Sequence, residues 1–130
     1  MKLGIAVLGV GRWGVHFVRN FLQHPQTELV AVVDKDENNL TRCREKFDLD
    51  SSKVLLTTHW EKVKQLTNLD AVVVATPATT HYSVIKDALL WGYHVLAEKP
   101  LTLDDMECVE LTELAAVSYT HLTLPTIYSV

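Results

Sequence analysis

The chain has 130 residues, a formal net charge of −4 at pH 7, and two cysteines that form no C-x-x-C motif. This length predicts one domain, and the acidic balance argues against nucleic acid as a main partner, because phosphate binding requires clustered Lys and Arg. No apolar run approaches the ~18 residues that a membrane span needs. We therefore expect a cytoplasmic protein with free thiols and no membrane partner.

The first distinctive feature is a glycine-rich turn, GVGRWG, at residues 9–14. An apolar run at residues 3–8 predicts a buried strand before it, and apolar residues at helical spacing follow it. A glycine turn between a strand and a helix is the context of a dinucleotide-binding fingerprint. Gly9 permits the tight turn, Gly11 lets a pyrophosphate approach the backbone, and Gly14 lets the helix pack closely on the strand. The N–H groups at the start of that helix would then face the phosphates.

The second predicted strand, at residues 29–33, ends in Asp34, a candidate ribose-binding residue. It follows Gly14 by about 20 residues, the spacing expected of the carboxylate that binds the ribose. The other interpretation is that Asp34 merely caps the helix that begins near Glu37. A carboxylate here favours NAD over NADP because it repels a 2′-phosphate, and Lys35 could reduce this preference by pairing with that phosphate.

Strands and helices continue to alternate along the rest of the chain. After the second strand we predict a helix from about 37, a strand over 53–57, a short helix over 60–66, a strand over 69–75, a helix from about 79 to 91, a strand over 93–97, and a last helix from about 102. This alternation with short connections predicts a parallel, doubly wound α/β sheet. In the Rossmann strand order 3-2-1-4-5, ligands bind beyond the carboxyl ends of the strands, at the reversal between strands one and four.

Four features fall at those carboxyl ends: the glycine turn, Asp34, Thr76-Pro77 and Glu98-Lys99-Pro100. One nucleotide could contact all four. Trp13 lies inside the turn, where it either covers the phosphates or wedges the helix against its neighbour, and we favour wedging.

No metal site is expected from the histidines. His16 and His24 lie on the first predicted helix without a partner at metal-ligand spacing, and His59 is interpreted as a local polar residue.

Three motifs occur together in this chain: the glycine turn, Thr76-Pro77 with His81 after it, and the run HVLAEKPL at residues 94–101. Together they resemble the glucose–fructose oxidoreductase/inositol dehydrogenase family, often written Gfo/Idh/MocA, over about residues 1–116. Glu-Lys-Pro at the end of a Rossmann strand is the most specific part. The resemblance implies a domain that binds NAD or NADP, in enzymes that oxidise or reduce sugars, cyclitols and related hydroxy compounds.

The resemblance also implies a catalytic role for Lys99. The matching family residue lies between nicotinamide and substrate, where its ammonium can hydrogen-bond the reacting oxygen and assist proton transfer. Glu98 would help to set the geometry around it, and the other interpretation of Lys99 is an exposed lysine after a strand. The candidate cofactor-binding residues are Gly9, Gly11, Arg12, Trp13, Gly14, Asp34, Lys35, Thr76, Pro77, His81, Glu98 and Lys99.

The end of the chain departs from the family. Family members continue into a second α/β domain that carries most substrate contacts, and we expect this domain to be absent here. Residues 117–130 look like a translated sequencing adapter joined to a truncated reading frame, although Thr, Ile and Tyr would also suit a genuine sixth strand. We therefore divide the chain into a dinucleotide-binding domain at 1–116 and a non-native tail at 117–130.

These observations predict the NAD(P)-binding part of an oxidoreductase that transfers hydride between a nicotinamide cofactor and a sugar, cyclitol or related hydroxy compound. We expect the complete protein to be a homo-oligomer and the fragment alone to be inactive. One alternative is a non-catalytic NAD(H)-binding sensor, since the same fold serves both functions. Another is a methyltransferase-like fold, against which the full G-x-G-x-x-G spacing and Glu98-Lys99-Pro100 count.

Overall fold

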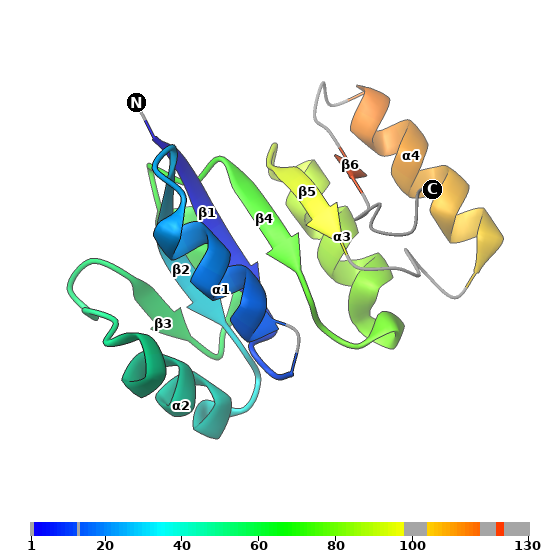
Figure 1. Cartoon of the computed structure of the whole chain (residues 1–130). Coiled ribbons are helices and arrows are strands. Elements are labelled where there is room, and N and C mark those ends of the chain that lie inside the picture. Colours follow the sequence, from blue (N-terminus) through cyan, green and yellow to red (C-terminus); the bar gives the residue numbers. More distant parts are fainter. Residues whose placement is uncertain (1, 13, 98–103, 118–121, 124–130) are drawn as a thin grey trace, which may run out of the picture.

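The computed structural model describes residues 2–12, 14–97, 104–117 and 122–123. These residues form a six-stranded sheet in the order β3-β2-β1-β4-β5-β6 (Figure 1). The strands are β1 (Leu3–Leu8), β2 (Thr27–Val33), β3 (Leu55–Thr57), β4 (Ala71–Val74), β5 (His94–Ala97) and β6 (Leu122–Thr123). The helices are α1 (Gly14–Gln23), α2 (Glu37–Phe47), α3 (His81–Leu90) and α4 (Asp105–Val117), with 3₁₀ helices η1 (Trp60–Gln65) and η2 (Ala78–Thr80).

The predicted Rossmann order is confirmed. All five strand pairs are parallel, and β1 lies at the centre, between β2 and β4. β2 and β3 therefore follow β1 on one side of the sheet, and β4, β5 and β6 follow on the other side. Because all the strands are parallel, their carboxyl ends lie at one edge of the sheet. The structure adds β6 beyond β5, where the prediction had five strands.

Two apolar layers cover the two faces of the sheet. In β1, Ile5 and Val7 belong to the layer beneath α1 and α2, whereas Ala6 and Leu8 belong to the layer beneath α3 and α4. Figure 1 shows α1 in front of the sheet and α3 behind it. Burial on both faces explains why the central strands are almost continuously apolar in sequence, as parallel strands between helices must be.

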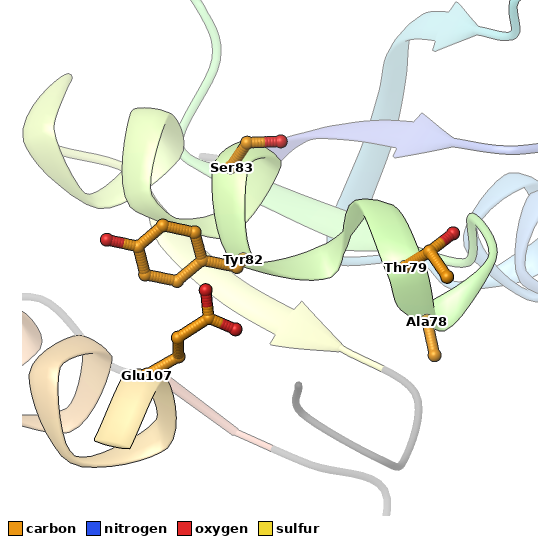
Figure 2. Close-up of a pocket in the computed structure, with 5 residues that line it drawn as sticks. All are labelled: Ala78, Thr79, Tyr82, Ser83 and Glu107. Carbon is orange, nitrogen blue, oxygen red and sulfur yellow. The ribbon is translucent and has the colours of Figure 1, made fainter. Parts of the chain in front are cut away.

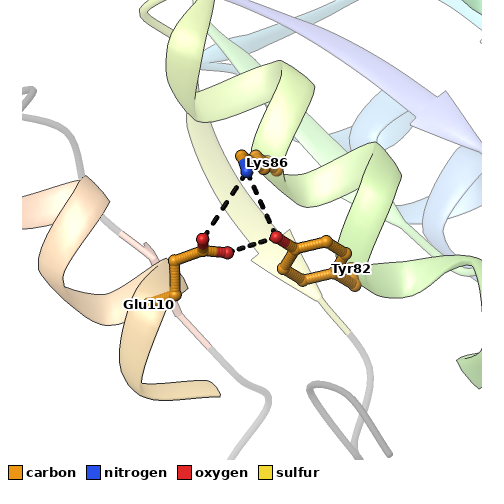
Figure 3. A network of polar contacts seen from close by, with 3 residues as sticks. All are labelled: Tyr82, Lys86 and Glu110. Carbon is orange, nitrogen blue, oxygen red and sulfur yellow. Dashed lines mark hydrogen bonds and ion pairs between the residues drawn. The ribbon is translucent and has the colours of Figure 1, made fainter. Parts of the chain in front are cut away.

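A polar network joins α3 to α4 at the surface (Figure 3). Lys86 Nζ donates to Tyr82 Oη at 3.1 Å and lies 3.5 Å from Glu110 Oε1, and Tyr82 also donates to Glu110. The hydrogen bond to Tyr82, followed by the charge of Glu110, raises the pKa of Lys86. Because these groups are exposed, the network orients α4 against α3 and contributes little to stability.

Short segments differ most from the predictions. The helix expected over 60–66 is the 3₁₀ helix η1. The apolar spacing after the glycine turn predicts a first helix from about Arg12, whereas α1 begins at Gly14. Among the described residues, no helix is both long and apolar enough to cross a membrane.

The division of the chain at residue 116 stays a prediction. Val117 is the last residue of α4, and residues 122 and 123 pair with Val95 and Leu96 of β5. If the tail is an appended segment, deleting residues 117–130 should leave the melting temperature nearly unchanged, within the few degrees that a loss of about 1 kcal/mol would cause in a domain of this size. Calorimetry of the truncated and complete chains measures this shift, and a much larger loss would mean that the tail is an integral strand.

Candidate nucleotide-binding site

A cavity of about 780 Å³ lies beyond the carboxyl ends of β1, β2 and β4. Ligand sites in proteins typically enclose 300–1,000 Å³. Seven of the predicted cofactor-binding residues line this cavity: Gly9, Gly11, Arg12, Asp34, Lys35, Thr76 and Pro77. The sheet topology thus brings together residues that are far apart in the sequence.

At Gly9 the backbone of the glycine turn packs closely against the residues that follow β4 and the end of β2. The Gly9 φ of +87° lies in the left-handed region that disfavours side chains. A Cβ at this position would lie 2.8 Å from the carbonyl carbon and oxygen of Ala75, and the Gly9 N–H donates to Val33 O at 2.7 Å. Gly9 is therefore required by the fold itself, where the turn meets the ends of β2 and β4.

Gly14 has a similar structural role. A Cβ there would lie 1.6 Å from the carbonyl oxygen of Gly9, a distance that no real contact allows. The first residue of α1 can pack against the turn only because it has no side chain, as the sequence predicted.

Gly11 differs from both of these glycines. A Cβ on Gly11 would meet no protein atom within 4 Å, although the residue lines the cavity. The protein therefore does not itself demand a glycine at position 11. A ligand that approaches the backbone would require a glycine there, because a side chain would occupy the same space. The turn therefore fits a pyrophosphate at this position. None of the first-turn residues of α1, all of which are described, is acidic, so no carboxylate there offsets the positive end of the helix.

Asp34 is held in place by three hydrogen bonds. Its Oδ2 accepts from the Val10 N–H at 2.9 Å and from Asn39 Nδ2 at 3.2 Å, and its Oδ1 accepts from the Asp36 N–H at 2.9 Å. The N-cap of α2 is Asp36, which accepts from the Asn38 N–H at 2.9 Å. Asp34 is therefore not the cap of α2, and its carboxylate is fixed at the cavity wall before any ligand arrives.

His81 lies beneath the cavity and does not line it. Its side chain is 1% exposed, and Nε2 lies 2.9 Å from the carbonyl oxygen of Thr76. Since a carbonyl only accepts, Nε2 carries the proton in this contact. Thr80 Oγ1 adds a hydrogen bond to Thr76 Oγ1 at 2.7 Å. His81 thus holds the loop after β4, and any effect on a cofactor would pass through Thr76 and Pro77.

Sequence reasoning missed several lining residues, of which Asn39 and Trp60 are the most informative. Asn39 lies in the first turn of α2, beside Asp34, and Trp60 follows β3 at the same sheet edge. The Trp60 Nε1 atom is buried and has no hydrogen-bond partner among the described residues. Its ring lies 4.9 Å from that of Trp91, between centroids. The rule that strand ends converge could have indicated Trp60, whereas nothing in the sequence marks Asn39.

A smaller cavity of about 230 Å³ adjoins the first at the start of α3 (Figure 2). It is lined by Ala78, Thr79, Tyr82, Ser83 and Glu107, and Ser83 also lines the larger cavity. Figure 2 shows the Glu107 carboxylate of α4 directed toward α3. This cavity therefore carries one carboxylate and the hydroxyls of Thr79, Tyr82 and Ser83.

Cys43 lies on the buried face of α2 and is 1% exposed. Burial raises the pKa of its thiol to about 11, with Lys46 lowering and Asp34 raising that value. The thiol is therefore protonated at neutral pH and is no nucleophile. Among the described residues, no group of three or more His, Cys, Asp or Glu side chains could hold a metal ion.

The family comparison agrees with this geometry. The sequence model described as "Oxidoreductase family, NAD-binding Rossmann fold" (GFO_IDH_MocA) matches residues 3–123. The chain belongs to this family. The NAD-binding fold predicted from the three motifs is therefore confirmed.

Several Gfo/Idh/MocA relatives are about one-third identical to this chain. An uncharacterized oxidoreductase of Synechocystis sp. is 33% identical over 114 residues, which are 88% of this chain and 30% of that protein. Inositol 2-dehydrogenase 4 of Saccharopolyspora erythraea is 33% identical over 113 residues, 86% of this chain and 32% of that protein. The crystal structure of GenD2 from gentamicin A biosynthesis, in complex with NAD, has a TM-score of 0.87 at 31% identity, covering 95% of this chain and 34% of that one. The chain thus spans about a third of the length of these relatives.

Three Gfo/Idh/MocA candidates lie outside the described residues: Trp13, Glu98 and Lys99. Their predicted roles therefore stay predictions, as does direct contact of His81 with a cofactor.

Gly11→Val should abolish nucleotide binding without unfolding the chain, because the new side chain occupies open cavity space. Isothermal titration with NADH measures the binding, and thermal unfolding measures the stability, which should stay close to that of the parent. Gly14→Ala is the contrasting variant, expected to destabilise the fold severely because its Cβ overlaps Gly9 O. Unchanged NADH affinity in Gly11→Val would show that the turn does not hold the cofactor.

Asp34 should make NAD bind more tightly than NADP, because its fixed carboxylate repels a 2′-phosphate. Asp34→Ala should narrow the gap between the two dissociation constants in parallel titrations. Asp34→Asn removes the charge at nearly the same size and should also narrow it, which separates charge from shape. Equal or tighter binding of NADP by the unaltered chain would contradict this assignment.

Proposed function

We propose that the complete protein is an NAD(P)-dependent oxidoreductase that transfers hydride between a nicotinamide cofactor and a sugar, cyclitol or related hydroxy compound. This chain would be its dinucleotide-binding portion. The observation that carries the proposal is Gly11, whose open side faces a cavity bordered by a fixed carboxylate, Asp34. Membership of the Gfo/Idh/MocA family supports the reaction class, and the likeness to an inositol 2-dehydrogenase supports a polyhydroxy substrate.

The binding half of this function is assigned to described residues. The backbone at Gly11 and the start of α1 would hold the pyrophosphate, and Asp34 would accept a hydrogen bond from the adenosine ribose. Thr76 and Pro77, held from below by His81, would border the half of the cofactor that reacts. The dinucleotide supplies the hydride acceptor or donor when it is bound.

The chemical half is assigned to Lys99. We propose that Lys99, as the neutral amine, accepts the proton of the substrate hydroxyl as hydride transfer proceeds, and that in the reverse direction its ammonium donates this proton back to the reacting oxygen. Glu98 would orient this ammonium. In the sequence Lys99 follows the last residue of β5 by two positions, and the carboxyl end of β5 lies at the same sheet edge as the cavity.

The sensor alternative gains no support from the two curated relatives described above, which are named as an oxidoreductase and an inositol 2-dehydrogenase. We further propose that the complete protein is a cytoplasmic homo-oligomer. Neither Cys43 nor Cys108, both of them described, is in a disulfide, which is consistent with a reducing compartment.

The 130-residue chain should bind NAD(H) weakly and turn over no sugar or cyclitol, because hydride transfer needs a substrate held against the nicotinamide. In the complete protein, Lys99→Ala should lower the turnover rate by roughly 10²-fold or more, the scale of general acid–base assistance. The absorbance of NADH at saturating myo-inositol and related polyols measures the turnover rate of the 130-residue chain and that of the complete protein with and without Lys99→Ala.

Lys62→Ala is the matched control, since Lys62 is an exposed lysine on η1 and should leave turnover unchanged. Turnover by the fragment alone would contradict the positioning argument. A complete protein unaffected by Lys99→Ala would contradict the catalytic role and favour the sensor alternative.

A further inference from the structure

The smaller cavity at the start of α3, which we call the α3–α4 cavity, carries one carboxylate. Its described lining residues are Ala78, Thr79, Tyr82, Ser83 and Glu107, none of which is basic, and its volume is about 230 Å³. This volume lies below the 300–1,000 Å³ of typical sites for drug-sized ligands, so the cavity suits one ring-sized group. Because Ser83 also lines the larger cavity, the two cavities adjoin at that residue.

The position of the α3–α4 cavity relates it to the proposed reaction. Its lining residues 78 and 79 directly follow Thr76-Pro77, the segment assigned above to the reacting half of the cofactor. Glu107 lies in the first turn of α4, and in the sequence Lys99 belongs to the connection that leads from β5 to this helix. The cavity is therefore bordered by both chain segments to which the proposed function assigns the chemistry.

Glu107 gives the α3–α4 cavity its charge. The Asp104 side chain accepts from the backbone N–H groups of Met106 and Glu107 at 2.7 and 3.3 Å, which fixes the first turn of α4. Figure 2 shows the Glu107 carboxylate directed toward α3. This carboxylate is partly buried, and among the described residues it has no hydrogen-bond or ion-pair partner. A carboxylate has about four acceptor positions, and no described residue occupies them.

The hydroxyl groups of the cavity add acceptors more than donors. Tyr82 donates to Glu110 and accepts from Lys86 Nζ at 3.1 Å, so its hydroxyl is already engaged (Figure 3). Ser83 Oγ donates to Thr80 O at 3.3 Å, which uses its proton and leaves its oxygen able to accept. A ligand that satisfies these groups must therefore be rich in hydrogen-bond donors.

The charge around the cavity favours a cationic ligand over an anionic one. Lys86 Nζ lies 3.5 Å from Glu110 Oε1, so these two opposite charges largely cancel. The charge of Glu107 has no counterpart among the described lining residues. The starts of α3 and α4 would otherwise attract an anion, but this carboxylate repels one. An ammonium would make charge-assisted hydrogen bonds to Glu107, which are roughly twice as strong as those between neutral groups.

We propose that the α3–α4 cavity binds the ammonium group of a polyhydroxy substrate, an amino sugar or an aminocyclitol. Glu107 accepts hydrogen bonds from the ammonium, and Thr79 and Ser83 contact the hydroxyl groups beside it. This inference rests on the proposed function, since it needs a substrate whose reacting hydroxyl lies against the cofactor. Glu107 is then the residue that selects amine-bearing substrates over their neutral counterparts.

The first test titrates the isotope-labelled 130-residue chain with glucosamine and with glucose at pH 7 and follows the backbone amide NMR signals of Thr79, Ser83 and Glu107. Glucosamine should shift these signals with a dissociation constant about tenfold or more below that of glucose, because only glucosamine carries the ammonium. Glu107→Gln should remove this difference. Glu107→Asp, which keeps the charge, should retain part of it.

Glu113→Gln is the matched control. Glu113 is an exposed glutamate on α4 that does not line the cavity, so the ratio of the two dissociation constants should change by less than about twofold. NADH added to the same sample should shift the Gly11 amide, which reports on the cofactor site independently. Methylammonium chloride is the probe for the ammonium alone and should bind more weakly than glucosamine.

The second test uses the complete protein. The ratio of kcat/KM for glucosamine to that for glucose should fall by about tenfold in Glu107→Gln, and the change should lie in KM, since the ammonium is bound away from the reacting hydroxyl. An unchanged ratio would overturn the inference.

Each contrary result of the NMR titration has a distinct meaning. Equal binding of glucosamine and glucose, or of neither, would overturn the inference, and a Gly11 shift with NADH in that sample would leave the proposed function standing. Absence of the Gly11 shift would contradict the proposed function. Methylammonium binding as tightly as glucosamine would mean a site for any small cation, which also contradicts the inference.

Discussion

The contact between the glycine turn and the backbone after β4 is the constraint on which the site depends. With φ at +87°, Gly9 places its Cα against Ala75, and Gly14 packs onto the Gly9 carbonyl. A hydrogen bond from Gly9 N to Val33 O fixes the same turn against β2. The turn is thus held from three directions, and Gly11 is left facing empty space. The cavity is a product of this packing, and it exists before a ligand enters.

The same preorganisation extends to the carboxylate and to the opposite wall. Asp34 is held by three donors from three residues, and the Thr76 carbonyl is held by the buried His81. Folding already orders these groups, so they lose little further conformational freedom when a nucleotide binds. What discriminates among nucleotides is then the fixed pattern of charge around the ribose.

The parts of the fold and site that could be predicted from sequence are those that local patterns encode. Apolar runs, the glycine spacing and the βαβ rule gave the strand order, and they placed Asp34 and Thr76 at the correct sheet edge. The packing of side chains between elements was not predictable in this way. The positions of Glu107 at the α3–α4 cavity, and of His81 beneath the loop, depend on how α3 and α4 pack against the sheet and each other. The 3₁₀ form of η1 was not predicted either, and short 3₁₀ segments of this kind are frequent as connectors between elements.

The three glycines of the turn separate folding from binding within six residues. A side chain at position 9 or 14 would clash with the protein's own backbone whether or not a ligand is bound, whereas a side chain at position 11 would clash only with a bound ligand. A descendant that lost its nucleotide would therefore be free to drift at position 11 and would still be confined to glycine at positions 9 and 14. The substitution pattern along this turn is thus a record of whether a lineage has continued to use its cofactor.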